Sequence, residues 1–293
     1  MKKRIALLGV ENSHAATFLK CINTFDEFSD IEVVGIYSDE KPAVDALVEK
    51  YGVPVLENYD SAVGAVDGII VTARHGDNHY KYAAPYIASG IPMFIDKPIT
   101  CSEEEAVRMM REMRAAGVRV SGGSSLRHDP DVISLADDAR NMKDGETVFG
   151  VVRAPVQMES VYGGFFFYSQ HLVEMMSEIY GKYPRAVTAV RNKNNLAVTF
   201  EYEEYNTVGL FSESGSVYSA ERHTQKTSRY ELIGKNGMDD WFIGVFREYV
   251  SLLRGEAQGR DYTDFIAPVF VMNAIKRSVD SGKREPVNTY SLD

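Results

Sequence analysis

The segment GVENSHA, residues 9–15, carries the first side chains whose types and spacing could do chemistry. It follows the apolar run RIALL and precedes an amphipathic segment, which is where a nucleotide-binding fold keeps its phosphate loop. Such a loop uses glycines because the backbone must approach the pyrophosphate at the start of a helix. Gly9 retains the first glycine, whereas Glu11 and His14 stand about where the second and third are expected. A carboxylate at Glu11 would repel phosphate if it pointed inward, but not if it pointed to solvent.

The two residues between these positions could bind an anion themselves. Asn12 or Ser13 would make a good N-cap for the following helix, and either could donate a hydrogen bond to a phosphate. His14, in the first turn, could do the same. The alternative is that Asn12 and Ser13 only cap a helix and bind nothing.

A polar pair follows the second apolar run, IEVVGIY. In a dinucleotide fold an acid at this strand end holds the ribose hydroxyls of NAD. If Ser38 takes the place of the acid, a ribose 2′-phosphate is tolerated, whereas Asp39 reaching inward favours NAD. We expect NAD, because no arginine flanks the pair and only Lys41 is near. The alternative for Asp39 is a solvated turn residue.

Two further pairs have helical spacing. His171 and Glu174 lie three residues apart, so they share one face of a helix, and the carboxylate could orient the imidazole and raise its pKa. The alternative is a solvated pair. His75 and His79 lie four apart, which would suit a metal, but no Cys or Glu at ligand spacing completes such a site. We therefore predict no metal.

The elements that must position these residues change in kind along the chain. Up to residue 126, short runs rich in Val and Ile alternate with amphipathic segments, which predicts a doubly wound parallel sheet of the Rossmann type. From residue 127 the apolar runs become longer, more alternating and more aromatic, which predicts an α+β domain on a mainly antiparallel sheet. We place the boundary near SSLRHDP, so the expected domains are 1–126 for the dinucleotide and 127–293 for the substrate and for oligomer contacts.

Composition narrows the class of protein. The 293 residues are 44% hydrophobic and carry a formal net charge of -10, which argues against nucleic acid as a partner. Cys21 and Cys101 lie far apart and suggest a reducing compartment. The first apolar run is too short for a signal peptide, and no run reaches membrane-spanning length. These features predict a cytoplasmic protein with no membrane partner.

The ordered motifs resemble the oxidoreductase family of glucose-fructose oxidoreductase, inositol dehydrogenase and the rhizopine-catabolism proteins (Gfo/Idh/MocA), as a divergent member. The resemblance covers nearly the whole chain, and the ordered set is more specific than any single motif. It implies an NAD(P)-dependent oxidoreductase acting on a sugar, a polyol or a related hydroxy compound. The matching segments are RIALLGVENSHA, VDGIIVTARHGDNH, DKP (96–98), LRHDP with Arg127 and Pro130, GGFFFYSQHLVE, and IGKNG (233–237).

The resemblance also implies roles for residues. Lys97 would lie between nicotinamide and substrate and hydrogen-bond the reacting hydroxyl, which suits a buried lysine with a lowered pKa. Asp96 would orient this turn, and His171 would be the acid/base group. The family commonly has an aspartate four residues before that histidine, but here the position holds Phe167, which cannot take a proton. Tyr168 is a substitute donor.

The resemblance implies roles for two more residues, and each role has an alternative. His79 would lie near the nicotinamide end of the pocket, or would only start a helix and pack. Arg127 would reach the domain junction, where it would hold structure or the substrate. The predicted catalytic residues are Lys97, Tyr168, His171 and Glu174, and the predicted cofactor-binding residues are Gly9, Glu11, Asn12, Ser13, His14, Ser38, Asp39, Thr72, Ala73, His75, His79, Asp96, Lys97 and Arg127.

Departures from the family pattern leave other functions open. The lost loop glycines and the aspartate replaced by Phe167 would also suit a non-catalytic, ligand-sensing or regulatory protein. A lyase or isomerase that uses bound cofactor transiently is a third reading. The segment between VVRAPVQ and GGFFF is shorter than the family leads us to expect, which suggests a trimmed pocket lid or a smaller interface. The resemblance further implies a homo-oligomer through the sheet of the second domain.

Overall fold

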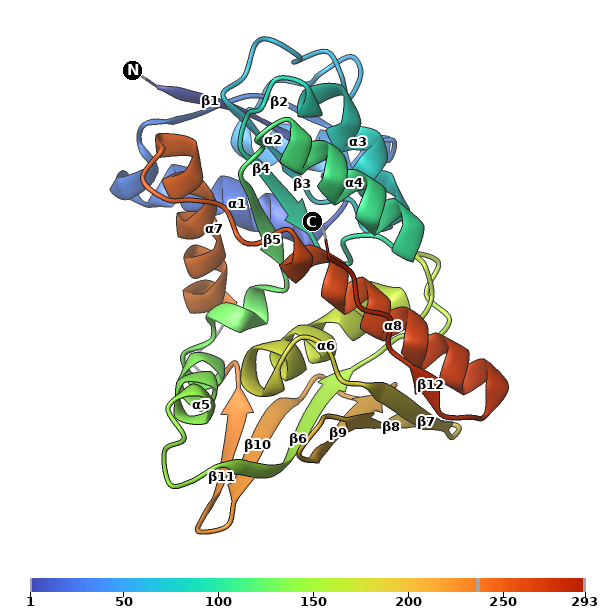
Figure 1. The fold of residues 1–293 in the computed structure, drawn as a ribbon. Coiled ribbons are helices and arrows are strands. Elements are labelled where there is room, and N and C mark those ends of the chain that lie inside the picture. Colours follow the sequence, from blue (N-terminus) through green and yellow to red (C-terminus); the bar gives the residue numbers. More distant parts are fainter. Residues whose placement is uncertain (1, 236–237, 292–293) are drawn as a thin grey trace.

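The first half of the chain forms a parallel sheet of five strands in the order β2-β1-β3-β4-β5 (Figure 1). The computed structural model describes residues 2–235 and 238–291. Every residue of β3, β4 and β5 is buried, because helices cover both faces of the sheet. The predicted Rossmann-type fold is confirmed. The strands are β1 (Lys3–Leu8), β2 (Ile31–Tyr37), β3 (Gly68–Val71), β4 (Met93–Asp96) and β5 (Val120–Gly123); the helices between them are α1 (Ser13–Thr24), α2 (Lys41–Tyr51), α3 (Asp77–Ile87) and α4 (Glu103–Ala115), with a short 3-10 turn η1 (Asp26–Phe28).

A second sheet has seven strands in the order β11-β10-β6-β9-β8-β7-β12. Its neighbouring strands are antiparallel except β6 and β9, so the prediction of a mainly antiparallel sheet is confirmed. The strands are β6 (Thr147–Pro155), β7 (Ala186–Arg191), β8 (Asn195–Glu201), β9 (Asn206–Ser212), β10 (Tyr218–Thr224), β11 (Ser228–Ile233) and β12 (Glu285–Pro286), and the remaining helices are η2 (Ser125–His128), α5 (Pro130–Arg140), α6 (Phe166–Tyr180), α7 (Met238–Arg254) and α8 (Thr263–Ser281).

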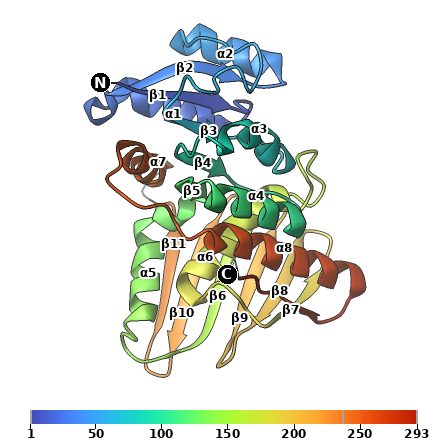
Figure 2. The ribbon, with the colours of Figure 1, turned by 45° about the horizontal axis from the view of Figure 1, so that its top comes forward.

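In the part of the chain that the structure describes, helices pack on one face of the second sheet: α5 on β10 and β11, α6 on β6 and β9, and α8 on β7 and β12 (Figure 2). Burial alternates along β8 and β9, as expected for strands with one face packed on the core. The other face leaves large apolar side chains in contact with solvent, among them Val190, Leu210 and Leu232. None of the helices in the described part of the chain is long and apolar enough to cross a bilayer.

Helices from the end of the chain return to the first sheet. α7 packs against β5 and α1, although it belongs to the segment predicted for the second domain. Phe246 of α7 stacks on Phe18 of α1 with ring centroids 5.3 Å apart. α8 runs beside α4, which Figure 2 shows clearly. The two sheets are therefore joined by packed helices, and the start of α6 lies below the carboxyl ends of the parallel strands (Figure 1).

Candidate functional site

A cavity of about 400 Å³ lies between the carboxyl ends of the parallel strands and the start of α6. Ligands of open parallel sheets bind at this edge. The cavity takes residues from the start of α1, from the loops after β3 and β4, and from α6, β10 and α7. Its described lining is Asn12, Ser13, His14, Arg74, Lys97, Ser125, Leu126, Gln157, Tyr162, Phe167, Tyr168, His171, Tyr218, Trp241 and Phe242.

Lys97 enters this cavity directly after β4. Its side chain is 3% exposed, and its Nζ lies 4.8 Å from the ring centroid of Phe167 and 4.9 Å from that of Tyr168. Nζ also contacts the backbone oxygen of Phe167 at 3.5 Å. Burial lowers the pKa of Lys97, and the neighbouring carboxylate of Asp96 offsets part of that effect. A buried lysine beside the cavity suits the role implied by the resemblance, a hydrogen bond to the reacting hydroxyl.

Asp96 is fully buried and positions the turn without lining the cavity. Its carboxylate accepts hydrogen bonds from the backbone N–H of Lys97 (2.8 Å) and from Nδ2 of Asn12 (3.2 Å), and it pairs with Nδ1 of His14 at 2.6 Å. Burial alone would raise the pKa of Asp96, but His14 and then Lys97 lower it below its ordinary value. The predicted cofactor residue Asp96 is therefore a residue that fixes the start of α1 to the end of β4.

His171 reaches the same cavity from α6. It is 6% exposed, and its Nδ1 lies 2.7 Å from Oγ of Ser124. The Ser124 hydroxyl accepts a hydrogen bond from Leu126 N, so its own proton is available for Nδ1, an arrangement that favours the neutral imidazole protonated on Nε2. Burial lowers the pKa of His171 well below its usual value, and the charge of Lys97 adds to this.

The predicted partnership of His171 with Glu174 is wrong. The Glu174 carboxylate accepts from the backbone N–H of Ser124 (2.9 Å) and from the Gln170 amide, and Arg260 lies 3.8 Å away. The three-residue spacing does place His171 and Glu174 on the same face of α6. However, each contacts Ser124 and not the other: His171 contacts its hydroxyl, and Glu174 accepts from its backbone N–H. Sequence reasoning missed Ser124 because nothing in SSLRHDP distinguishes one serine of the pair from the other.

The phosphate loop keeps its first glycine. Gly9 has φ +74°, and a Cβ at this position would lie 2.5 Å from the backbone nitrogen of Ala73, so only glycine fits. Thr72 Oγ1 donates to the carbonyl of Gly9 at 3.0 Å. The predicted residues Thr72 and Ala73 thus shape the loop, and neither lines the cavity. Asn12 caps α1 by accepting from the backbone N–H of His14, as predicted.

Glu11 points inward. Its Oε2 accepts a hydrogen bond from Oγ of Ser38 (2.6 Å), after β2, and its Oε1 accepts one from the backbone N–H of Arg74 (3.0 Å), after β3. Because β1 lies between these two strands, the carboxylate spans the crevice above β1. This is where a dinucleotide crosses the sheet edge in folds of this kind. Of the two orientations left open by the sequence, the structure has the one that opposes phosphate.

Asp39 does not face the crevice. Its carboxylate accepts from the hydroxyls of Tyr37 (2.6 Å) and Tyr82 (2.9 Å) and from Lys81 Nζ (3.0 Å). Hydrogen bonding from Tyr37 lowers the pKa of Asp39, so the group stays ionised. Two carboxylates therefore lie near the end of β2: Asp39 follows this strand, and Glu11 reaches Ser38 from the loop after β1.

A nicotinamide dinucleotide fits one end of this site and meets an obstacle at the other. The start of α1 and the cavity with Lys97 suit the nicotinamide end, since backbone N–H groups and an open volume meet there. The adenosine end is crossed by the Glu11 carboxylate. Glu11 is partly exposed, and a dinucleotide that crosses here would have to displace its side chain from Ser38 and Arg74.

Two other predicted cofactor residues lie outside the cavity. His79 is fully buried, and its ring nitrogens contact the carbonyl oxygens of Ala73 (2.8 Å) and Ile99 (3.2 Å). Burial lowers its pKa, so His79 joins two loops, which is the packing role left open by the sequence. Arg127 is wrong as a cofactor ligand, because its guanidinium pairs with Glu248 of α7 and does not reach the cavity.

The Arg127–Glu248 pair gives stability a dependence on pH. Burial alone would raise the pKa of Glu248, but the hydrogen bond from His128 and the charge of Arg127 lower it to about 2. A lowered pKa in the folded state contributes stability above the unfolded-state pKa of about 4.3, and that contribution is lost as the pH falls toward 2. We expect the unfolding free energy to fall by about 3 kcal/mol across this window through Glu248 alone.

Urea unfolding at pH values from 7 to 2 measures this effect. Glu248→Gln should be less stable than wild type by about 3 kcal/mol at pH 7, and the difference should vanish toward pH 2. Glu112→Gln is the matched control, because Glu112 pairs with Arg108 on the exposed surface. A difference that stays constant with pH would contradict the assignment.

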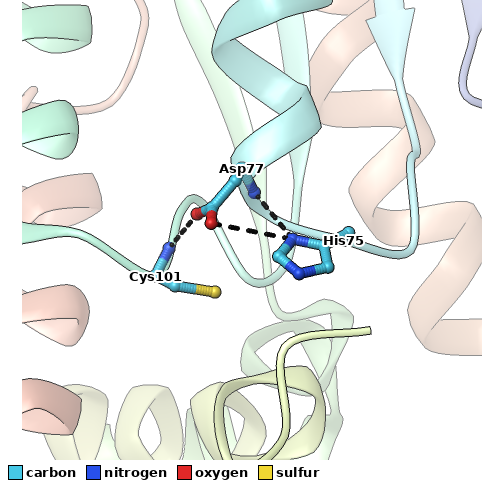
Figure 3. A group of neighbouring side chains, drawn as sticks. All are labelled: His75, Asp77 and Cys101. Atoms are coloured by element: carbon cyan, nitrogen blue, oxygen red, sulfur yellow. Dashed lines mark hydrogen bonds and ion pairs between the residues drawn. The ribbon is translucent and has the colours of Figure 1, made fainter. Parts of the chain in front are cut away.

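His75 lies with two other potential metal ligands, Asp77 and Cys101 (Figure 3). Their ligand atoms are within 4.8 Å of one another, so the fold brings to His75 a cysteine that the spacing along the sequence did not indicate. Asp77 accepts from the backbone N–H of Cys101 (3.0 Å) and from Thr100 Oγ1 (3.2 Å). Burial, and then Asp77, raise the pKa of the Cys101 thiol, which opposes the thiolate that a metal needs. These contacts explain the cluster as the hydrogen-bonded start of α3.

Comparisons with known proteins agree with this geometry. Residues 3–124 match the family described as "Oxidoreductase family, NAD-binding Rossmann fold". Inositol 2-dehydrogenase of Paracoccus denitrificans is 38% identical over 71 residues, 24% of this chain, and glucose-6-phosphate 3-dehydrogenase of Bacillus subtilis is 26% identical over 129 residues, 43% of this chain. The matched segments span 21% and 35% of these two relatives.

A solved structure matches the whole fold. GenD2 from gentamicin A biosynthesis in complex with NAD superposes with a TM-score of 0.85 over 98% of this chain and 97% of that one, at 16% identity. At this identity the likeness shows the fold alone. Together with the family match, it indicates an NAD(P)-binding oxidoreductase fold of the kind found in inositol and sugar dehydrogenases.

Proposed function

We propose that this chain belongs to the oxidoreductase family of glucose-fructose oxidoreductase, inositol dehydrogenase and the rhizopine-catabolism proteins, and that it is an NAD-dependent dehydrogenase of a sugar, a polyol or a related hydroxy compound. The observation that carries the proposal is the convergence of Lys97 and His171 on one cavity. The first comes from the parallel sheet and the second from α6, and both have lowered pKa values. Perturbed titratable groups that converge in a cavity are typical of active sites.

In the proposed reaction the nicotinamide ring, when bound, exchanges a hydride with the carbon that carries the reacting oxygen. Lys97 Nζ hydrogen-bonds that oxygen and holds the developing charge. His171 takes up or supplies the hydroxyl proton. Ser124 fixes the imidazole, and Gln170 accepts the backbone N–H of Ile99 at 3.0 Å, which ties α6 to the turn that carries Lys97.

Phe167 changes the proton path relative to the family pattern. Its ring lies against the Lys97 ammonium, where the family commonly has an aspartate. No carboxylate relay is therefore available at this position. Tyr168 lies next to Phe167 and lines the cavity, and its ring is 5.7 Å from the His171 ring, so its hydroxyl is the substitute donor in our proposal.

The proposed preference for NAD over NADP rests on charge. The Glu11 carboxylate hydrogen-bonds Ser38 at the end of β2, and a ribose 2′-phosphate there would meet its negative charge. The nearby cations do not compensate, because Lys81 pairs with Asp39 and Lys41 with Asp45.

Absorbance of NADH during turnover tests the proposal. A panel of neutral and anionic sugars and polyols, each offered with NAD and with NADP, should contain at least one compound oxidised with NAD in preference to NADP. His171→Gln should lower kcat for that compound by about a hundredfold or more, the usual contribution of a general acid/base. His223→Gln is the control and should leave kcat unchanged, because His223 is a partly exposed histidine of β10 that pairs with Glu221. No turnover with any compound, despite NADH binding, would refute the proposed reaction.

A second candidate function is a ligand-sensing or regulatory protein that kept the fold. The inward Glu11 carboxylate favours it, since it occupies the crevice that catalysis needs. Absence of turnover together with specific retention of a protein partner would favour this reading.

We also propose, as the resemblance implies, that copies of the chain associate through the uncovered face of the second sheet, which exposes Val190, Leu210, Tyr230 and Leu232.

A further inference from the structure

The charges around the cavity differ in sign from those of the chain as a whole. The protein has a formal net charge of -10, yet the described side chains that line the cavity include two cations, Arg74 and Lys97, and no carboxylate. The start of α1 also lines it, and the N-terminus of a helix attracts anions.

Neither cation has an acidic partner among the described residues. Lys97 Nζ contacts two aromatic rings and one carbonyl oxygen. The Arg74 guanidinium lies 5.0 Å from the ring centroid of Tyr162, and its Nη1 donates to the Tyr162 hydroxyl at 3.0 Å. Tyr162 fixes the guanidinium but leaves most of its N–H donors unused. A nearly buried ammonium that makes no direct ion pair is costly even with Asp96 nearby, so a ligand that brings a negative charge stabilises the site.

The two cations also act on each other. Burial has the largest effect on the Lys97 pKa, Asp96 offsets part of it, and Arg74 lowers it further. Arg74 and Lys97 are therefore close enough to repel. An anionic group that binds Arg74 relieves this repulsion while Lys97 remains at the reacting oxygen.

We propose that the substrate is anionic: a hydroxylated compound whose carboxylate or phosphate binds the guanidinium of Arg74, while Lys97 and His171 act on a hydroxyl of the same molecule. This inference rests on the proposed dehydrogenase function and adds the substrate class. Arginine suits the role because its planar N–H groups bind carboxylate or phosphate in pairs. The flat walls of Tyr168, Trp241 and Phe242 suit the apolar face of a sugar ring.

Calorimetric titration of the protein with saturating NADH tests the inference. The probes are glucuronate, glucose 6-phosphate, glucose and myo-inositol, so that the two anionic arms separate carboxylate from phosphate. We expect at least one anionic probe to bind about tenfold or more tightly than both neutral ones, and the preference to weaken at high salt. Arg74→Gln should abolish this preference and leave the affinity for the neutral probes within about twofold.

Arg108→Gln is the matched control. Arg108 also lies over a tyrosine ring, that of Tyr80 at 4.8 Å, but it is on the exposed surface and pairs with Glu112. Its replacement should change no affinity. Equal affinity for anionic and neutral probes, or failure of every anionic probe to bind, would overturn the inference.

Two results separate this inference from the proposed function. Turnover of a neutral polyol with no anionic preference would leave the dehydrogenase standing and refute the anionic substrate. If Arg74→Gln lowers the affinity for NADH and leaves the affinities for the four probes unchanged, Arg74 binds the cofactor phosphates. That result would also refute the anionic substrate. The NADH titration of the same variant supplies that readout without any need for activity.

Discussion

Replacing Glu11 by glycine is expected to tighten NADH binding by about ten- to a hundredfold, which corresponds to about 1.4–2.8 kcal/mol. In the wild type, the carboxylate must leave Ser38 Oγ and the Arg74 N–H before the dinucleotide can cross the sheet edge. Each hydrogen bond to a charged group contributes about 1.5–3 kcal/mol. Glycine removes both the obstacle and the charge, and a bound phosphate can then accept the Arg74 N–H. Calorimetric titration of both proteins with NADH measures the change.

Glu11→Gln separates charge from bulk. It keeps the size and one acceptor oxygen but removes the negative charge, so we expect an affinity between those of wild type and Glu11→Gly. Glu40→Gly is a control, since Glu40 is exposed beyond the end of β2. Unchanged or weaker NADH binding in Glu11→Gly would mean that the carboxylate does not oppose the cofactor.

Replacing Lys97 by methionine is expected to lower kcat by about a thousandfold, or about 4 kcal/mol of transition-state stabilisation. Methionine fills a similar volume between the rings of Phe167 and Tyr168, so folding should be retained. The loss is specific to the transition state because the ammonium stabilises the oxygen as its charge changes. Steady-state kinetics on the compound found in the turnover screen, with NADH affinity measured in parallel, gives both quantities.

Lys41→Met is the matched control for Lys97→Met. Lys41 is exposed at the start of α2 and pairs with Asp45 four residues on, far from any proposed chemistry. It should retain wild-type kcat. A Lys97→Met protein with kcat within tenfold of wild type would show that the turn does not supply the polarising group.

The fold and the position of Lys97 at the sheet edge could be predicted because they depend on local pattern. Buried Val- and Ile-rich strands alternating with amphipathic helices define the first sheet, and the carboxyl ends of such strands always share one edge. Lys97 follows β4 directly, so its arrival at that edge needs no long-range information. The place of His171 came from the resemblance, which carries the arrangement of the second half with it.

The features of the site that were not predicted from the sequence depend on contacts between residues far apart in the chain. Arg127 looked like a junction residue, but its partner is Glu248, 121 residues on, in a helix that returns to the first sheet. Spacing placed Glu174 on the face of His171, yet a spacing cannot show that Ser124 lies between them. The direction of Glu11 likewise depends on Ser38 and on a backbone N–H after β3, which no local pattern includes.

The measurement that tests the central claim most directly is a calorimetric titration of the wild-type protein with NADH and with NADPH at the same ionic strength. We expect one site per chain that binds NADH in preference to NADPH, because the Glu11 carboxylate lies against Ser38 at the end of β2, where a ribose 2′-phosphate would bind. Absence of binding by either cofactor, in wild type and in Glu11→Gly alike, would contradict the assignment of the crevice to a nicotinamide dinucleotide.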